Sequence, residues 1–536
     1  MLTNSMILFL GGVAPYTTQF CSRAFKTKCF ATKTGWPHYK EEMPEFVQEI
    51  HSISELPYVQ DCGGSLRCLV SEHTFKVPLL NNDSSNSNSN SNNQLIDVHA
   101  TIVDKLPPDT SSSQIFKFFS SSKNLAASYS ELMSKKNSRS LLYLQGGPGF
   151  PSPRPGSSLS ISHTGSGSWA SDAIVNKDID RLVLLDQRGT GRSSPVSYQT
   201  LEMQFTDATA AASYLTNFRA DAIVADSEQI KKKLLGPAKN WDVVLGQSFG
   251  GFCLATLLLT LPKNEHPKRA LFTGGIPPAC ASIDATYEKL WQRVRKCNDW
   301  YYSKYPGDIN NVKAIVTHLN ENKVELPSGG KLTARRFLSV GISLGGGDGA
   351  HEALHELVLS AFLPNSRTIS TNFLRKLESL QPFDSNPIYF LLHESIYMEK
   401  GKGASNFAAM RTMPSDFQID TSKERVNFFG ETVFKHMSED FVELNSNFMV
   451  DVATLLSEKS DWGDLYSGGE TSSFPNAAAA VYIDDMYVDY NLTEQTIEHK
   501  LQQCNKYITN ELQHSGLRMR GSFLFDKLYN LCQVEK

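Results

Sequence analysis

The sequence predicts an α/β protein with a mostly parallel sheet and a helical cap inserted into it. From about residue 140, short apolar runs alternate with segments of helical periodicity, which is typical of a parallel sheet with helices on both faces. The buried-strand runs stop after about residue 282 and return only at 477–484. We therefore expect residues 46–282 and 476–536 to form the core and residues 283–475 to form the cap.

The first part of the core contains four expected strands before its centre. Residues 72–79 are a strand candidate, and residues 95–103 resume as a strand with period-2 character. Between them lies the tract 81–94, which is almost wholly Asn and Ser and cannot form a packed core. We expect a hairpin with a disordered tip here. Residues 140–144 and 181–185 are mostly apolar and predict buried strands.

Later segments are assigned by the same periodicities. We expect helices at 221–235, 287–305 and 351–362, and further strands at 269–273 and 506–510.

Residues 1–45 form a leader outside this pattern. Residues 1–40 contain five Lys or Arg and no acidic residue. They resemble an organelle transit peptide, and the alternative is a disordered leader without a targeting signal.

Nine cysteines, scattered without metal-ligand spacing, favour reduced thiols inside a cell. The expected location is therefore intracellular: the cytoplasm, or a plastid or mitochondrion if the leader is a transit peptide.

The net charge and the lengths of the apolar runs argue against nucleic acid and membranes as partners. The net charge is −4, and because residues 1–40 contribute +5, the remainder carries −9. This mild acidity argues against a nucleic-acid binder. No apolar run is long enough to span a membrane, so no membrane partner is expected. The sequence indicates no oligomeric state.

The centre of the core is a strand, a tight turn and a helix. The apolar run 241–245 is followed by Gly-Gln-Ser-Phe-Gly-Gly and then by an apolar segment of helical length. This order is the nucleophile elbow of an α/β-hydrolase. Gly246 and Gly250 leave room for the turn, which presents Ser248 at the head of the following helix. The alternative is an ordinary Gly-rich turn.

A serine nucleophile requires a base and an acid, which follow it in this fold in the order acid, then His. Asp484 and Asp485 end the strand that follows the cap, and His514 lies on a loop after the next strand. His499 is the rival base, but its segment predicts an exposed helix. Because the pleat sends adjacent side chains to opposite sides, only one aspartate can face the imidazole. We expect the other to cap the next helix or to bond nearby backbone.

A second Gly-rich turn, Gln145-Gly-Gly-Pro-Gly149, follows the strand where this fold places an oxyanion donor. We assign that donor to the N–H of Gly147, with Gly146 as the rival. The N–H of Phe249 is the expected partner donor. The alternative is a plain tight turn.

Several motifs, in this order and spacing, resemble those of proline iminopeptidases, which are serine peptidases of the α/β-hydrolase fold. They include Gln145-Gly-Gly-Pro-Gly149, Asp186-Gln-Arg-Gly-Thr-Gly191, Gly246-Gln-Ser-Phe-Gly-Gly251, Gly274-Gly-Ile-Pro-Pro278, His393-Glu394, Gly430-Glu431, Asp484-Asp-Met-Tyr-Val488 and 510–518. The resemblance covers about residues 70–536.

The resemblance implies a serine aminopeptidase that releases N-terminal proline from peptides through an acyl-enzyme, without a metal or other cofactor. Its pattern of an acid directly before Met selects Asp485 as the triad acid. It also implies that Glu394 and Glu431 of the cap bind the substrate amine. One departure is Gln145, where many relatives have His, and this leaves open how the loop is braced.

Two local alternatives remain open in the cap. Glu394 and Glu431 lie in apolar sequence, which suits a buried cation site, but each can instead pair with an Arg or Lys of the cap. Phe428, Phe429 and Phe434 can line a pocket for the pyrrolidine ring or pack in the core.

Two other functions compete with the peptidase. One is an esterase or amidase of the same fold, in which the two glutamates bind no amine. The other is a non-catalytic ligand receptor, which an active-serine phosphonate probe would leave unlabelled.

Overall fold

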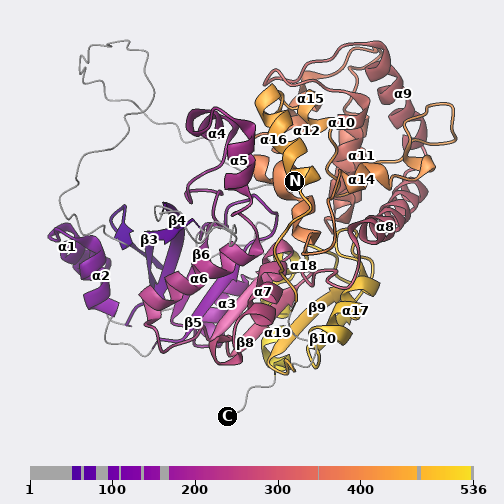
Figure 1. Cartoon of the computed structure of the whole chain (residues 1–536). Helices are drawn as coiled ribbons and strands as arrows, with labels where there is room; N and C mark the ends of the chain where they lie inside the picture. Colours follow the sequence, from indigo (N-terminus) through magenta and orange to yellow (C-terminus); the bar gives the residue numbers. More distant parts are fainter. Residues whose placement is uncertain are drawn as a thin grey trace, which may run out of the picture.

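The computed structural model describes residues 51–61, 66–79, 94–107, 110–133, 138–156, 168–347, 349–467 and 473–532. The chain forms a twisted sheet flanked by helices, and a helical cap lies over one end of it (Figure 1). The predicted leader, 1–45, and residues 81–93 of the Asn/Ser tract lie outside the described residues.

The described sheet has the strand order β1-β3-β4-β6-β5-β7-β8-β9-β10, and β2 pairs with β3. The first strands are β1 (His51–Ile53), β2 (Tyr58–Asp61), β3 (Arg67–Pro78) and β4 (Leu95–Lys105). The others are β5 (Ser140–Leu144), β6 (Arg181–Leu185), β7 (Val243–Gln247), β8 (Arg269–Thr273), β9 (Ala477–Tyr482) and β10 (Asn505–Thr509).

The pairing of β6, β5, β7, β8, β9 and β10 is parallel throughout. Every residue of β5, β6, β7 and β9 is buried, as expected for strands covered on both faces. Because the carboxyl ends of these strands meet at one edge, the loops after β5, β7, β8, β9 and β10 converge there. This convergence positions the candidate site.

The N-terminal strands are antiparallel and extend the sheet. β4 pairs with β3 over its whole length, from Cys68↔Lys105 to Pro78↔Leu95, and this confirms the predicted strands and their hairpin pairing. β4 then joins β6 antiparallel. β1 and β2, of three and four residues, were not predicted, because strands this short show no measurable alternation.

Helices cover both faces of the parallel strands. α3 (Trp169–Asn176) and α19 (Gly521–Leu531) share one hydrophobic cluster, while α6 (Ala220–Leu235) and α7 (Phe249–Thr260) share another. The other core helices are α1 (Ser112–Ser120), α2 (Leu125–Met133), α4 (Tyr198–Gln204), α5 (Ala208–Leu215), η2 (Lys263–Glu265), α17 (Tyr490–His499) and α18 (Gly516–Met519).

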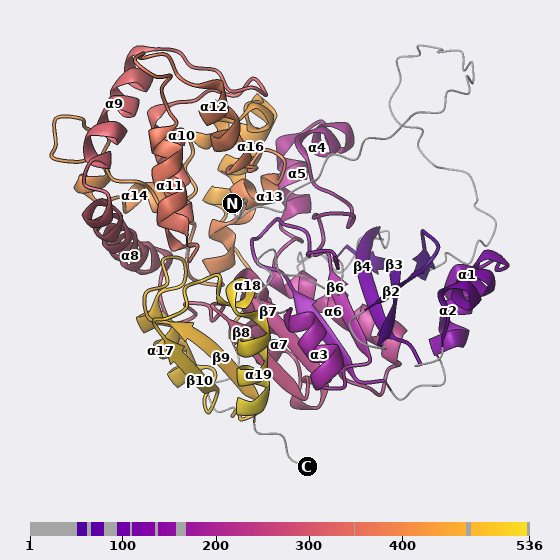
Figure 2. The ribbon, with the colours of Figure 1, turned by 180° about the vertical axis from the view of Figure 1, so that it is seen from behind.

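Between β8 and β9 the described chain consists of helices and loops, and its only β-pairings are isolated bridges. Its longer helices are α8 (Ile283–Lys304), α9 (Asp308–Glu321), α11 (Ala350–Leu359), α12 (Thr371–Ser379) and α16 (Asn447–Glu458). The shorter ones are α10 (Ala334–Leu338), η3 (Ser339–Gly345), α13 (Pro387–Leu392), η4 (Glu394–Tyr397), α14 (Ala408–Arg411), η5 (Ser415–Phe417), α15 (Met437–Asp440) and η6 (Val442–Leu444). The view from behind shows these elements grouped on one side of the molecule (Figure 2).

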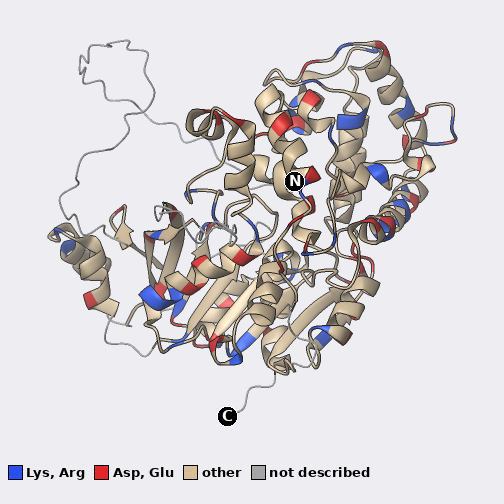
Figure 3. Ribbon diagram, viewed as in Figure 1, with Lys and Arg blue, Asp and Glu red and all other residues tan. Residues whose placement is uncertain are grey.

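Charged residues lie mainly on helices and loops, and the strands β7 and β9 contain none (Figure 3). Within the described ranges, no helix combines the length and the apolar character needed to cross a membrane.

Candidate active site

Ser248 lies in a sharp turn between β7 and α7. Its backbone has φ +54°, a conformation that L-residues rarely adopt. A side chain at Gly246 would place its Cβ 2.5 Å from the carbonyl oxygen of Gly250, and one at Gly250 would lie 2.0 Å from the carbonyl oxygen of Leu144. The glycines are therefore required by close backbone approach, and the turn presents Ser248 at the head of α7.

His514 and Asp485 are in direct contact at the ends of the last two strands. His514 Nδ1 lies 2.8 Å from Asp485 Oδ2, and both side chains are buried. The other oxygen, Oδ1, accepts hydrogen bonds from the backbone N–H groups of Tyr487 and Val488 at 2.8 and 3.1 Å. The Asp485 carboxylate is thus held by three contacts in one orientation.

Asp484 and His499 lie elsewhere. Asp484 pairs with Lys296 of α8 at 2.5 Å. Our expectation that the second aspartate caps the next helix or bonds nearby backbone is wrong, because Asp489 caps α17 and Lys296 offers Asp484 a nearby cation. His499 ends α17 and is exposed.

Two consecutive glycines after β8 lie between His514 and Ser248. A Cβ on Gly274 would lie 3.0 Å from His514 Nδ1, and one on Gly275 would lie 2.4 Å from the backbone oxygen of Ser248. The residues Ser248 and His514 therefore flank one short segment of backbone.

The turn after β5 lies against the elbow. A Cβ on Gly146 would be 2.8 Å from Ser248 Cβ. Gly147 follows with φ +140°, which favours glycine. Gln145, whose role in bracing was open, has two contacts: its Oε1 accepts from Tyr143 Oη at 2.7 Å, and its backbone oxygen accepts from Gln187 Nε2 at 2.8 Å.

Glu394 is buried in the cap at the start of η4. The N–H groups of Ala408 and Ala409 donate to its two oxygens, each at 3.0 Å. Burial nevertheless raises the pKa of Glu394 to about 7. Arg411, whose charge acts on Glu394, is bonded to Asp284 instead.

Glu431 is partly buried and has no hydrogen-bond or ion-pair partner among the described residues. Burial, and next the nearby charge of Asp485, raise the pKa of Glu431 to about 8. The Glu431 carboxyl group therefore lies within electrostatic range of the Asp485 carboxylate. Neither Glu394 nor Glu431 forms an ion pair with a described Lys or Arg, contrary to the alternative considered for them.

Comparisons with known proteins agree with this geometry. Residues 139–317 match the model of the alpha/beta hydrolase fold family. The chain is 37% identical over 393 residues to a proline iminopeptidase of Aeromonas sobria, covering 73% of this chain and 87% of that protein. It is 32% identical over 399 residues to one of Aspergillus aculeatus, covering 73% of this chain and 84% of the relative. The chain belongs to the proline iminopeptidase family.

Among solved structures, a bromoperoxidase from Bacillus anthracis matches with a TM-score of 0.32 and 13% identity, over 85% of this chain and 97% of that one.

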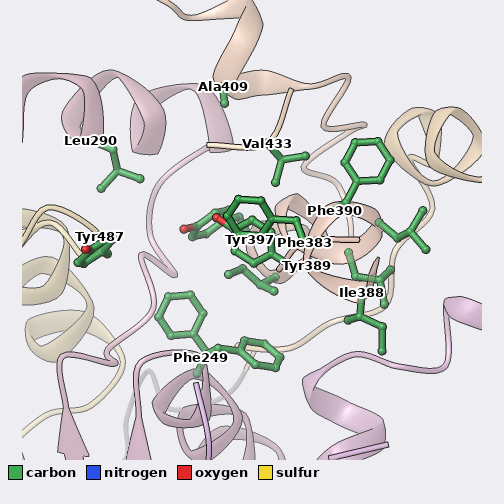
Figure 4. Close-up of a cluster of buried hydrophobic side chains, with 14 of the residues drawn as sticks. Phe249, Leu290, Phe383, Ile388, Tyr389, Phe390, Tyr397, Ala409, Val433 and Tyr487 are labelled. Atoms are coloured by element: carbon green, nitrogen blue, oxygen red, sulfur yellow. The ribbon is translucent and has the colours of Figure 1, made fainter. Parts of the chain in front are cut away.

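The cap of this proline iminopeptidase family member places aromatic side chains above the elbow. Figure 4 shows Phe249, at the head of α7, facing Tyr389 and Tyr397 of the cap, with Tyr487 to one side. Tyr487 also packs against His514, with ring centroids 4.6 Å apart. Sequence reasoning missed these tyrosines, since they lie in segments without periodicity and only Tyr487 belongs to a quoted motif.

The three candidate pocket phenylalanines pack within the cap. Phe428 contacts Tyr301, Tyr302 and Phe337, while Phe429 and Phe434 contact Trp291. All three are fully buried. The core-packing alternative therefore accounts for them.

Several buried polar atoms near the glutamates have no hydrogen-bond partner in the structure. They are the hydroxyls of Tyr287 and Tyr389 and both ring nitrogens of His393. Burial lowers the pKa of His393 to about 3, so this imidazole is neutral at physiological pH. Within the described part of the chain, no cluster of three or more His, Cys, Asp or Glu is placed to hold a metal ion.

Proposed function

We propose that this chain releases an N-terminal proline from peptides through an acyl-enzyme on Ser248. The observation that carries the proposal is the 2.8 Å contact between His514 Nδ1 and Asp485 Oδ2 beside the Ser248 elbow. A hydrogen bond from Nδ1–H to Asp485 leaves Nε2 unprotonated, which is the form that accepts the serine proton.

The steps follow from these roles. Ser248 Oγ attacks the prolyl carbonyl carbon and gives its proton to His514. The oxyanion that forms is held by the N–H groups of Gly147 and Phe249, since one lies in the turn beside Ser248 and the other heads α7. His514 then protonates the leaving amine, and water releases proline from the ester by the same route in reverse.

Recognition of the substrate amine is assigned to Glu394 and Glu431. A protonated secondary amine that enters an apolar pocket requires a negative charge beside it. Glu431 has no described partner, and the hydrogen-bond donors to Glu394 are neutral: two backbone N–H groups and the hydroxyl of Ser405. Both carboxyl groups are therefore available to a cation.

The experiment compares the hydrolysis rates of prolyl, alanyl and N-blocked prolyl anilides. We expect the prolyl anilide to be fastest and the N-blocked compound to be cleaved poorly, because it lacks the ammonium. Equal rates for free and N-blocked proline would favour a general esterase or amidase. Failure of a phosphonate probe to label Ser248 would favour a non-catalytic receptor.

A further inference from the structure

We propose that Gln187 is a positioning residue that holds the oxyanion loop through the carbonyl group of Gln145. The inference rests on the proposed function, because it concerns the loop that presents the Gly147 N–H.

The contact joins two loops that are 42 residues apart in sequence. Gln187 Nε2 donates to the backbone oxygen of Gln145 at 2.8 Å, and the Gln187 side chain is almost fully buried. Gln145 is the first residue after β5, so its carbonyl group belongs to the peptide unit that leads into Gly146. The bond therefore sets the plane of the first peptide of the loop.

Gln187 is itself well anchored. Its backbone oxygen accepts from the N–H of Thr190 at 3.0 Å and from Thr190 Oγ1 at 2.7 Å. The preceding Asp186 accepts from Ser152 N and from Arg154 Nη1, each at 2.9 Å. Because these bonds restrain the turn that carries Gln187, its Nε2 donor cannot move freely with the loop that begins at Gln145. The hydrogen bond can therefore hold that loop in place.

The loop needs such a brace because Gly146 and Gly147 have no side chains of their own to anchor it. A rotation of the Gln145–Gly146 peptide would turn the following N–H groups away from the oxygen of the carbonyl group that Ser248 attacks. Oxyanion stabilisation depends on donors that are correctly oriented before the reaction. Since the bond goes to a main-chain carbonyl, it is independent of which side chain stands at position 145.

The test is Gln187→Met, which keeps the size of the side chain and removes the donor. The matched control is Gln381→Met in the cap. Gln381 is equally buried, and its Nε2 also donates to a backbone oxygen, that of Arg336, at 2.8 Å. Thermal unfolding of both variants measures the general loss of a buried hydrogen bond. If Gln187→Met does not fold, Gln187→Asn, whose amide is one methylene too short, replaces it.

The readout separates ground-state binding from transition-state stabilisation. Pyrrolidine-2-boronic acid accepts the Ser248 oxygen on its boron, forming a tetrahedral adduct that places an oxygen where the oxyanion would be, whereas L-proline forms no such bond. For Gln187→Met we expect kcat for prolyl anilide to fall about 10- to 100-fold, as for loss of part of an oxyanion hole. Boronate inhibition should weaken by a similar factor, while the inhibition constant of L-proline stays within about twofold.

The inference would be overturned if Gln187→Met kept the wild-type kcat and the wild-type affinity for the boronate. It would also be overturned if the variant bound the boronate and L-proline more weakly by the same factor. The third contrary result is an equal loss of kcat in Gln381→Met. Failure of the proposed function gives a different result. In that case the wild-type protein itself would bind the boronate no more tightly than Ser248→Ala does.

Discussion

The carboxylates on the core side and on the cap side of the candidate site differ in how they are bonded. On the core side, Asp485 is bonded by His514 and two backbone N–H groups, and the buried Arg188 is bonded by Asp226 and by the carbonyl group of Asn217. On the cap side, Glu431 has no described partner, and Tyr389 and His393 have buried polar atoms without one.

An unpaired buried polar atom destabilises a fold by about 1–3 kcal/mol, so those of Tyr389 and His393, which lie near the two glutamates, require a reason. Catalytic groups must be in place before the substrate arrives, and the three contacts of the proposed triad acid, Asp485, suit that requirement. A recognition site for a charged amine must instead leave its acceptors free until the substrate is bound. The comparison predicts large rate losses from changes on the core side and losses specific to the substrate from changes on the cap side.

The largest effect is expected from Ser248→Ala. Removing the nucleophile should lower kcat by about 10⁴- to 10⁶-fold for every substrate, including simple esters. Circular dichroism should show an unchanged fold, because only one hydroxyl is lost. If a clean preparation of Ser248→Ala turned over substrate at the wild-type rate, the proposed catalytic role of the core side would be refuted.

The next effect separates the two adjacent aspartates. Asp485→Asn should lower kcat by about 10⁴-fold, because the amide favours the wrong imidazole tautomer. Asp484→Asn is the matched control and should have little effect on kcat, since it loses only a partly exposed ion pair with Lys296. The reverse order of the two effects would assign the acid to Asp484.

A smaller, selective effect is expected from Glu431→Gln. Loss of one charge-assisted hydrogen bond to the ammonium corresponds to roughly 10- to 150-fold in kcat/KM for prolyl anilide. An acetate ester carries no ammonium and should be hydrolysed at nearly the wild-type rate. Glu394→Gln should change the rates in the same direction. Amine recognition would be refuted if the ratio of prolyl anilide hydrolysis to acetate ester hydrolysis were unchanged in both variants.

The smallest effect is a pH dependence of that ratio. With the pKa of Glu431 at about 8, the ionised fraction rises about fivefold between pH 7 and pH 8. The ratio of prolyl anilide to acetate ester hydrolysis should increase over this interval by a similar factor, because only the carboxylate pairs with the ammonium. Glu431→Gln should reduce the increase to about twofold, which is what ionisation of Glu394 with a pKa of about 7 supplies, and a fivefold increase in that variant would assign it to another group.

The raised pKa also affects the stability of the free enzyme. Near pH 4.5 the unfolded chain releases the Glu431 proton, whereas the folded chain keeps it until about pH 8. The unfolded state therefore binds fewer protons across this window, and the contribution of Glu431 to stability falls as pH rises. The melting temperature of Glu431→Gln should decline less than that of the wild type between pH 5 and pH 8.

The core was predictable because its reactive residues are tied to strand ends. Ser248 and Asp485 each follow a buried strand, His514 follows the partly exposed strand β10, and parallel strands bring their carboxyl ends to one edge. The strands themselves are buried on both faces and therefore appear as short apolar runs. Their predicted positions agree with the structure.

The contacts between loops and within the cap were beyond sequence reasoning. Nothing local indicates that the Gln187 amide meets the carbonyl group of Gln145, or that Lys296 meets Asp484, because these contacts depend on tertiary packing. Likewise, Tyr389 and His393 belong to short helices in continuous apolar sequence, which does not indicate which side chains face the site. Periodicity identifies a buried segment but not the direction of its side chains within a cap that is buried on several sides.

The strained backbone of Ser248 has a consequence for the evolution of this protein. At φ +54°, glycine would be relaxed where any other residue is not, so Ser248→Gly should yield a dead enzyme that melts at a higher temperature than Ser248→Ala. Selection for thermal stability alone would thus have replaced this serine. The proposed role of Ser248 as the nucleophile accounts for a serine here, as expected where activity and stability compete at one position.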